Sequence, residues 1–145
     1  LIEKRVYDIC DEIEKRKLNG IRIRCSNGIR ADRVDSKLLQ RMKEVGFYCL
    51  AFGVESASNK VLATIKKGEK IERIEETVKE ACQLGFWVEL FFLIGSPGET
   101  WTDIQESIKF ALRYQNGGMR PRENPIGSPI FIFCRVKGRS TRQTV

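Results

Sequence analysis

The turn Gly95-Ser96-Pro97-Gly98 is the strongest candidate for a ligand-binding element in the sequence. It follows the apolar run Leu90–Ile94 and precedes a segment whose apolar residues recur at helical spacing. A strand, a glycine turn and a helix in this order place backbone N–H groups beyond the carboxyl end of a strand, where α/β folds bind ligands. Such a turn suits many anionic or adenosyl ligands, so on its own it does not identify one.

Two kinds of charged side chain are expected at the same edge of the sheet. Glu55 directly follows the apolar segment Phe47–Val54, which is a second strand candidate. Its carboxylate can accept hydrogen bonds from a ribose or an ammonium group, or it can be a solvated acid or a helix cap. Lys66 and Lys67 end a short helix, where a cation either binds a ligand carboxylate or complements the helix dipole.

The elements that must position these residues alternate between helices and strands. This order predicts an α/β fold in which neighbouring strands are parallel and joined by right-handed crossovers. Turns are expected at Ser26-Asn27-Gly28 and after Gly46 and Gly85. Helices are predicted over Leu1–Lys17, from Asp35 or Ser36 to about Val45, over Asn59–Ile65 and Ile71–Leu84, and from Thr100 or Thr102 to about Leu112; strands are predicted over Ile21–Cys25, Phe47–Val54 and Leu90–Ile94.

The C-terminal residues differ from the rest of the chain in composition. The formal net charge is +7, and the residues from Asn116 onward carry six basic side chains and one acidic side chain. A basic tail of this kind is more typical of solvation than of nucleic-acid binding. We predict one folded unit over residues 1–114 and a Gly/Pro-rich basic tail over residues 115–145, with one possible strand at Ile130–Val136. No apolar run is long enough to span a membrane.

The five cysteines lie far apart in the sequence, at positions 10, 25, 49, 82 and 134. There is no C-x-x-C pair and no histidine. This pattern argues against a zinc site and against the disulfide framework of a secreted protein. It favours buried free thiols in a cytosolic protein.

Five motifs in series resemble the radical S-adenosylmethionine superfamily, most closely its cobalamin-binding branch and relatives. Each motif alone is a weak signal, but their order and spacing over residues 1–114 are specific. The motifs are Asn27-Gly28-Ile29-Arg30-Ala31-Asp32; Leu38-Leu39 through Met42-Lys43 to Gly46; Phe52-Gly53-Val54-Glu55-Ser56; Val61-Leu62 with Ile65-Lys66-Lys67-Gly68; and Phe92-Leu93-Ile94-Gly95-Ser96-Pro97-Gly98-Glu99-Thr100.

The resemblance implies the C-terminal half of a partial TIM-like (β/α)6 barrel. It also implies the family reaction, in which a [4Fe–4S] cluster cleaves S-adenosylmethionine reductively and the resulting deoxyadenosyl radical abstracts hydrogen. Glu55 and Ser56 would contact the ribose or amino group of the ligand, and Lys67 its methionyl carboxylate. The residues that would pack on the adenine are Leu93, Ile94, Gly95, Ser96 and Pro97.

Two parts of the family pattern are missing from this sequence. The cluster loop C-x-x-x-C-x-x-C is absent, and so are the first two β-α units. We therefore expect no catalytic or metal-ligating residue in this chain and no reaction by this chain alone. The implied partner is the N-terminal half of the barrel, and cobalamin would come with a further domain. The alternative function is a non-catalytic α/β module for interaction or assembly. The open sheet edges of a half barrel predict self-association of the isolated chain.

Overall fold

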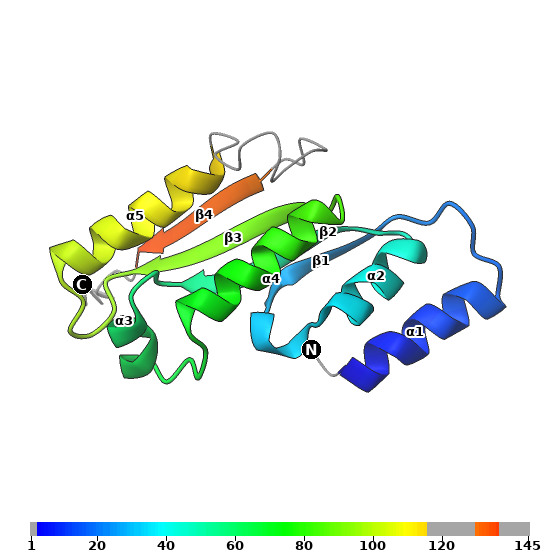
Figure 1. The fold of residues 1–145 in the computed structure, drawn as a ribbon, viewed down its shortest axis with the longest axis horizontal. Helices are drawn as coiled ribbons and strands as arrows, with labels where there is room; N and C mark the ends of the chain where they lie inside the picture. Colours follow the sequence, from blue (N-terminus) through cyan, green and yellow to red (C-terminus); the bar gives the residue numbers. More distant parts are fainter. Residues whose placement is uncertain (1–2, 116–129, 137–145) are drawn as a thin grey trace, which may run out of the picture.

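The computed structural model describes residues 3–115 and 130–136 (Figure 1). The helices are α1 (Glu3–Lys15), α2 (Ser36–Glu44), α3 (Asn59–Thr64), α4 (Ile71–Gln83) and α5 (Trp101–Gln115), with a 3-10 turn η1 at Ala31–Arg33. The strands are β1 (Ile23–Ile29), β2 (Phe47–Glu55), β3 (Trp87–Ile94) and β4 (Ile130–Val136). No described helix has the length and apolar character needed to cross a membrane.

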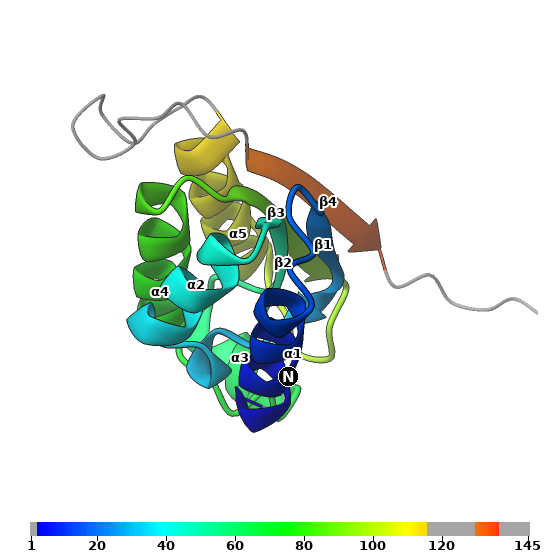
Figure 2. The same cartoon turned by 90° about the vertical axis from the view of Figure 1, so that its right-hand side faces the viewer.

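The four strands form one parallel sheet in the order β1-β2-β3-β4. This confirms the predicted α/β fold with parallel neighbouring strands. Helices α1, α2, α4 and α5 all lie on one side of the sheet (Figure 2). We call the opposite side the inner face, because in a closed barrel of this handedness the helices are outside.

The two faces of the sheet carry different side chains. The core beneath the helices includes Leu50 and Phe52 of β2, and Val88, Leu90 and Phe92 of β3. Because successive side chains of a strand point to opposite faces, the residues between them lie on the inner face. On β2 these are small, and on β3 they include Glu89.

The first strand is longer than its sequence indicated. The strand predicted over Ile21–Cys25 is present, but its bounds and the turn predicted at residues 26–28 are wrong, because β1 begins at Ile23 and runs to Ile29 with an irregularity after Cys25. Gly28 lies in contact with β2: an added Cβ would be 3.4 Å from the Gly53 nitrogen. The polar Ser-Asn-Gly segment is therefore absorbed as a bulge within the ladder instead of ending it.

Helix α5 begins with a reciprocal cap between Thr100 and Asp103. The Asp103 carboxylate accepts a hydrogen bond from the Thr100 N–H (2.8 Å), and the Thr100 hydroxyl accepts one from the Asp103 N–H (3.3 Å). Phe110 and Tyr114 are the large side chains that this helix buries. The apolar residues whose spacing predicted this helix are largely exposed instead. Trp101 is 66% exposed, and Ile108 and Leu112 are also exposed.

Candidate functional site

Glu55 and Lys67 meet at the carboxyl end of β2, as their sequence positions indicated. The Lys67 Nζ lies 3.3 Å from the Glu55 Oε1. Both groups fold over Gly53 on the inner face: an added Cβ at Gly53 would be 2.8 Å from the Glu55 Oε1 and 3.0 Å from the Lys67 Nζ. Glu55 has a positive φ of 64°. A strand that ends in this left-handed conformation turns sharply, which directs the next residues away from the sheet.

A second carboxylate, that of Glu69, also pairs with Lys67. This residue was not identified from the sequence. Its side chain is completely buried, and its Oε2 lies 3.5 Å from the Lys67 Nζ. Its other oxygen accepts a hydrogen bond from the Asp32 N–H (3.1 Å). The only available signal was an acidic residue directly after the Lys-Lys-Gly segment. The Lys67 ammonium group therefore lies between the partly exposed carboxylate of Glu55 and the buried carboxylate of Glu69.

Arg30 fastens the same loop from the end of β1. Its guanidinium donates to the Lys67 carbonyl oxygen (2.9 Å) and to both carboxylate oxygens of Asp32 (2.9 and 2.7 Å). These bonds from Arg30 are the main cause that lowers the pKa of Asp32. Arg30 thus connects the loop after β1 to the loop that contains Lys67.

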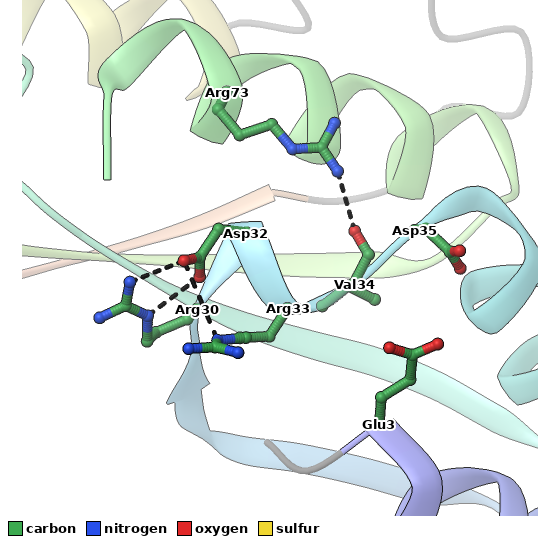
Figure 3. A pocket seen from close by; sticks show the side chains of 7 residues that line it. All are labelled: Glu3, Arg30, Asp32, Arg33, Val34, Asp35 and Arg73. Carbon is green, nitrogen blue, oxygen red and sulfur yellow. Dashed lines mark hydrogen bonds and ion pairs between the residues drawn. The ribbon is translucent and has the colours of Figure 1, made fainter. Parts of the chain in front are cut away.

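A cavity of about 520 Å³ lies beside Arg30, but it is a weaker candidate for a ligand site than the Glu55–Lys67 pair. It is lined by three arginines, three acids and one valine (Figure 3), namely Glu3, Arg30, Asp32, Arg33, Val34, Asp35 and Arg73. Opposite charges balance there, and several of the groups are already engaged. Arg73 donates to the Val34 carbonyl (3.1 Å), and Asp35 accepts from the Leu38 N–H at the start of α2 (2.8 Å).

The glycine turn after β3 has its N–H groups engaged by its own chain. The Glu99 carboxylate accepts hydrogen bonds from the Gly95 N–H (2.6 Å) and the Ser96 N–H (3.1 Å). Two of the N–H groups that were expected beyond the end of this strand are therefore already bonded within the chain. The Ser96 hydroxyl is buried and has no hydrogen-bond partner in the part of the chain that the structure describes. Leu93 and Ile94 are half-buried, and Pro97 is exposed.

The Ser56 side chain is turned into the protein. It lies 3.3 Å from the Ser107 hydroxyl and accepts a hydrogen bond from the Ser58 N–H (3.2 Å). The Ser58 hydroxyl in turn donates to Asp103 (2.7 Å). Hydrogen bonds from Thr100 and then Ser58 hold the pKa of Asp103 well below its usual range. This buried network, which sequence reasoning did not find, joins the loop after β2 to the loop after β3.

The carboxyl ends of β2 and β3 thus form one rim of defined chemistry. It offers an ammonium group, a half-exposed carboxylate, an unpaired hydroxyl and two apolar side chains. Such a set fits a ligand with a charged amino-acid end and an apolar or aromatic end. Among the side chains that the structure describes, those of residues 3–114, no three His, Cys, Asp or Glu are placed to hold a metal ion.

Comparison with known proteins supports a single family. The family model of the Radical SAM superfamily matches residues 1–111. An uncharacterized methyltransferase of Pyrococcus horikoshii is 35% identical over 111 residues, which are 77% of this chain and 24% of that protein.

Solved structures show the same fold at lower identity. The radical S-adenosylmethionine methyltransferase TsrM from Kitasatospora setae, with tryptophan and a SAM analog bound, matches with a TM-score of 0.65 and 19% identity, over 72% of this chain and 22% of that one. The cobalamin-dependent S-adenosylmethionine radical enzyme OxsB matches with a TM-score of 0.64 and 22% identity, over 78% and 17%. The chain spans a quarter or less of the length of each of these proteins. The expected partial barrel is confirmed, and the chain belongs to the Radical SAM superfamily.

Proposed function

We propose that this chain is the part of a radical enzyme that binds S-adenosylmethionine and substrate. The observation that carries the proposal is the pairing of Lys67 with Glu55 over Gly53, on the inner face and at the carboxyl end of β2. A zwitterionic amino-acid group can replace this pair charge for charge, because its carboxylate binds the ammonium and its donors bind the carboxylate. Glu69 keeps Lys67 in place during that exchange.

The remaining contacts follow from the neighbouring rim. Glu55 would accept from the ribose or amino group of the ligand, and Lys67 would bind the methionyl carboxylate. The adenine would pack against residues 93–97, where the half-buried Leu93 and Ile94 supply apolar surface. The Ser96 hydroxyl, which has no hydrogen-bond partner among the described residues, could form a hydrogen bond with the adenine. The Ser56 side chain is committed to Ser107, so of this residue only the backbone is available to a ligand.

The proposed chemistry requires parts that this chain does not provide. When bound, a [4Fe–4S] cluster supplies the electron that cleaves S-adenosylmethionine, and the described residues offer no ligands for it. We therefore place the cluster on an N-terminal half of the barrel, and cobalamin, where it is used, on a further domain. The relatives with methyltransferase names favour methyl transfer as the reaction class. We propose that the chain has no catalytic activity by itself. We also propose that it is located in the cytoplasm.

Titration calorimetry with S-adenosylmethionine tests the proposed site. We expect binding weaker than micromolar, because half of the barrel contacts are missing. The Lys67→Met variant should weaken it by roughly tenfold or more, since a charge-assisted hydrogen bond to the ligand carboxylate is lost. Lys66→Met is the matched control: Lys66 is exposed, has a positive φ of 54° and carries the same charge one residue away, and its removal should leave the affinity unchanged.

Two results would contradict this proposal. Equal affinities for Lys67→Met and the parent chain would remove Lys67 from the site. Sub-micromolar binding by the parent chain would show that the N-terminal half is not needed. Thermal unfolding of each variant confirms that the comparison is made on folded protein.

The edge strand β1 is where we propose that the N-terminal half of the barrel pairs. No described strand covers its outer side, so a row of backbone N–H and C=O groups is open there. Without that partner, we expect the chain to self-associate through β1, with a mass in light scattering that rises with concentration. Ser26→Lys, a charge placed at an exposed position of this edge, should reduce the association. A parent chain that stays monomeric at high concentration would refute the expectation.

A further inference from the structure

Glu89 is a charged residue on the inner face that the site described above does not use. Its neighbours Val88 and Leu90 belong to the core beneath the helices, so strand alternation turns Glu89 to the opposite side. Its side chain is only 6% exposed. Carboxylates are almost never buried to this degree unless they are paired.

The carboxylate of Glu89 is only half paired. Arg24 of β1 reaches across β2 and donates to its Oε1. The Oε2 is buried and has no hydrogen-bond partner among the residues that the structure describes. Burial and then the charge of Glu89 raise the pKa of the neighbouring Cys49 thiol. An unpaired, buried carboxylate oxygen costs free energy, which favours a donor from outside the described residues that completes it.

Glu89 lies within reach of a molecule bound beside the rim. It is opposite Ala51 in the register of β2 and β3. Ala51 precedes Glu55 by four residues, which is about 13 Å along a strand. Between them on the inner face, β2 carries only Gly53, which has no side chain. A substrate beside the ligand of Glu55 and Lys67 would therefore extend toward Glu89.

We propose that Glu89 is a substrate-binding residue whose free oxygen accepts a hydrogen bond from a neutral N–H group, such as an amide or a heteroaromatic ring nitrogen. Arg24 already balances the charge of Glu89, so a cationic donor would leave a net positive charge at this buried position. A neutral donor completes the carboxylate without that penalty. The assignment rests on the proposed function, in which the inner face holds the substrate.

NMR titration of the labelled 145-residue chain with N-methylacetamide tests the donor chemistry. We expect saturable shifts at the Glu89 carboxyl carbon and at the amides of Arg24 and Ala51. N,N-dimethylacetamide, in which a methyl group replaces the N–H hydrogen, should give none. Glu89→Leu should weaken the response to N-methylacetamide by roughly tenfold or more, whereas Glu76→Leu, at an exposed acid on α4, should leave it unchanged. Equal responses to the two amides, or no saturable shift at Glu89, would overturn the assignment.

A double variant separates a binding role from a structural one. Replacing a half-satisfied buried ion pair by apolar side chains commonly stabilises a protein. The Arg24→Leu/Glu89→Leu chain should therefore have a higher midpoint of thermal unfolding than the parent, and a lower midpoint would assign the pair a structural role instead. The same experiments distinguish failure of the proposed S-adenosylmethionine site from failure of the Glu89 assignment. If N-methylacetamide binds at Glu89 but S-adenosylmethionine shows no Lys67-dependent binding, only the S-adenosylmethionine site is refuted. The reverse result would refute the Glu89 assignment alone.

Discussion

The Gly46→Ala variant is expected to lose roughly 3 kcal/mol or more of its free energy of unfolding. Gly46 joins α2 to β2 with a φ of 104°, which side chains rarely adopt. An added Cβ would lie 2.3 Å from the Ile21 carbonyl oxygen, a backbone atom that cannot rotate away. The Gly46 carbonyl also accepts a hydrogen bond from the Ile23 N–H (2.9 Å), where β1 begins beside β2. The clash therefore disturbs the start of both strands.

Urea unfolding followed by circular dichroism measures this loss, which is large against the 5–15 kcal/mol or so of a typical domain. Gly20→Ala is the matched control. Gly20 also has a positive φ, of 80°, but an added Cβ there meets nothing within 4 Å. It should cost only about 1 kcal/mol for the left-handed conformation. Equal losses in the two variants would show that the clash with Ile21 is relieved.

The Asp103→Asn variant is expected to lower the midpoint of thermal unfolding by roughly 5 °C or more. Asp103 accepts hydrogen bonds from the Thr100 hydroxyl (2.6 Å), the Thr100 N–H (2.8 Å) and the Ser58 hydroxyl (2.7 Å). An amide lacks the charge that strengthens these bonds, and its nitrogen cannot accept. Lys60→Met is the control, because Lys60 is 62% exposed and 3.5 Å from Asp103, so its loss should change little.

The pH dependence of stability gives a second measurement on Asp103. Its pKa is lower in the folded protein than in the unfolded chain, so it stabilises the fold fully above its ordinary pKa. That stabilisation is lost as the pH falls through the folded pKa. The difference between the parent and Asp103→Asn should therefore be largest near neutral pH and shrink in acid. A difference independent of pH would show that the carboxylate charge is not what stabilises the network.

The Asp103 network also links stability to the proposed site. It ties the loop that starts at Glu55 to the loop that follows Ile94 through Ser58 and Ser107. Loosening it should increase amide hydrogen exchange in both loops while the centre of β2 stays protected. Increased exchange in only one loop would indicate that the two loops are held independently.

Local sequence signals predicted the elements and the rim where ligands are expected. The alternation of helices and strands predicted a parallel sheet, and Asp35 was a correct candidate cap of α2. Glu55, at the end of a strand, and Lys67, after the short helix that follows, were expected at the same rim, and they lie 3.3 Å apart. These predictions succeed because they depend on short-range periodicity and chain direction, which are properties of the sequence itself. The S-adenosylmethionine contacts assigned to this rim remain predictions.

Only the tertiary structure decided which partner each polar group has. The Ser-Asn-Gly segment has the composition of a turn, yet it pairs as part of β1 because Gly28 packs against Gly53. Ser56 follows a strand at the rim, yet its hydroxyl is buried against Ser107, fifty-one residues away. Glu69 and Glu89 carry no local pattern, and their roles arise from neighbours on other strands and loops. Composition and spacing therefore determined the order of the elements and the rim, whereas the burial and pairing of charges depended on long-range contacts that no local pattern encodes.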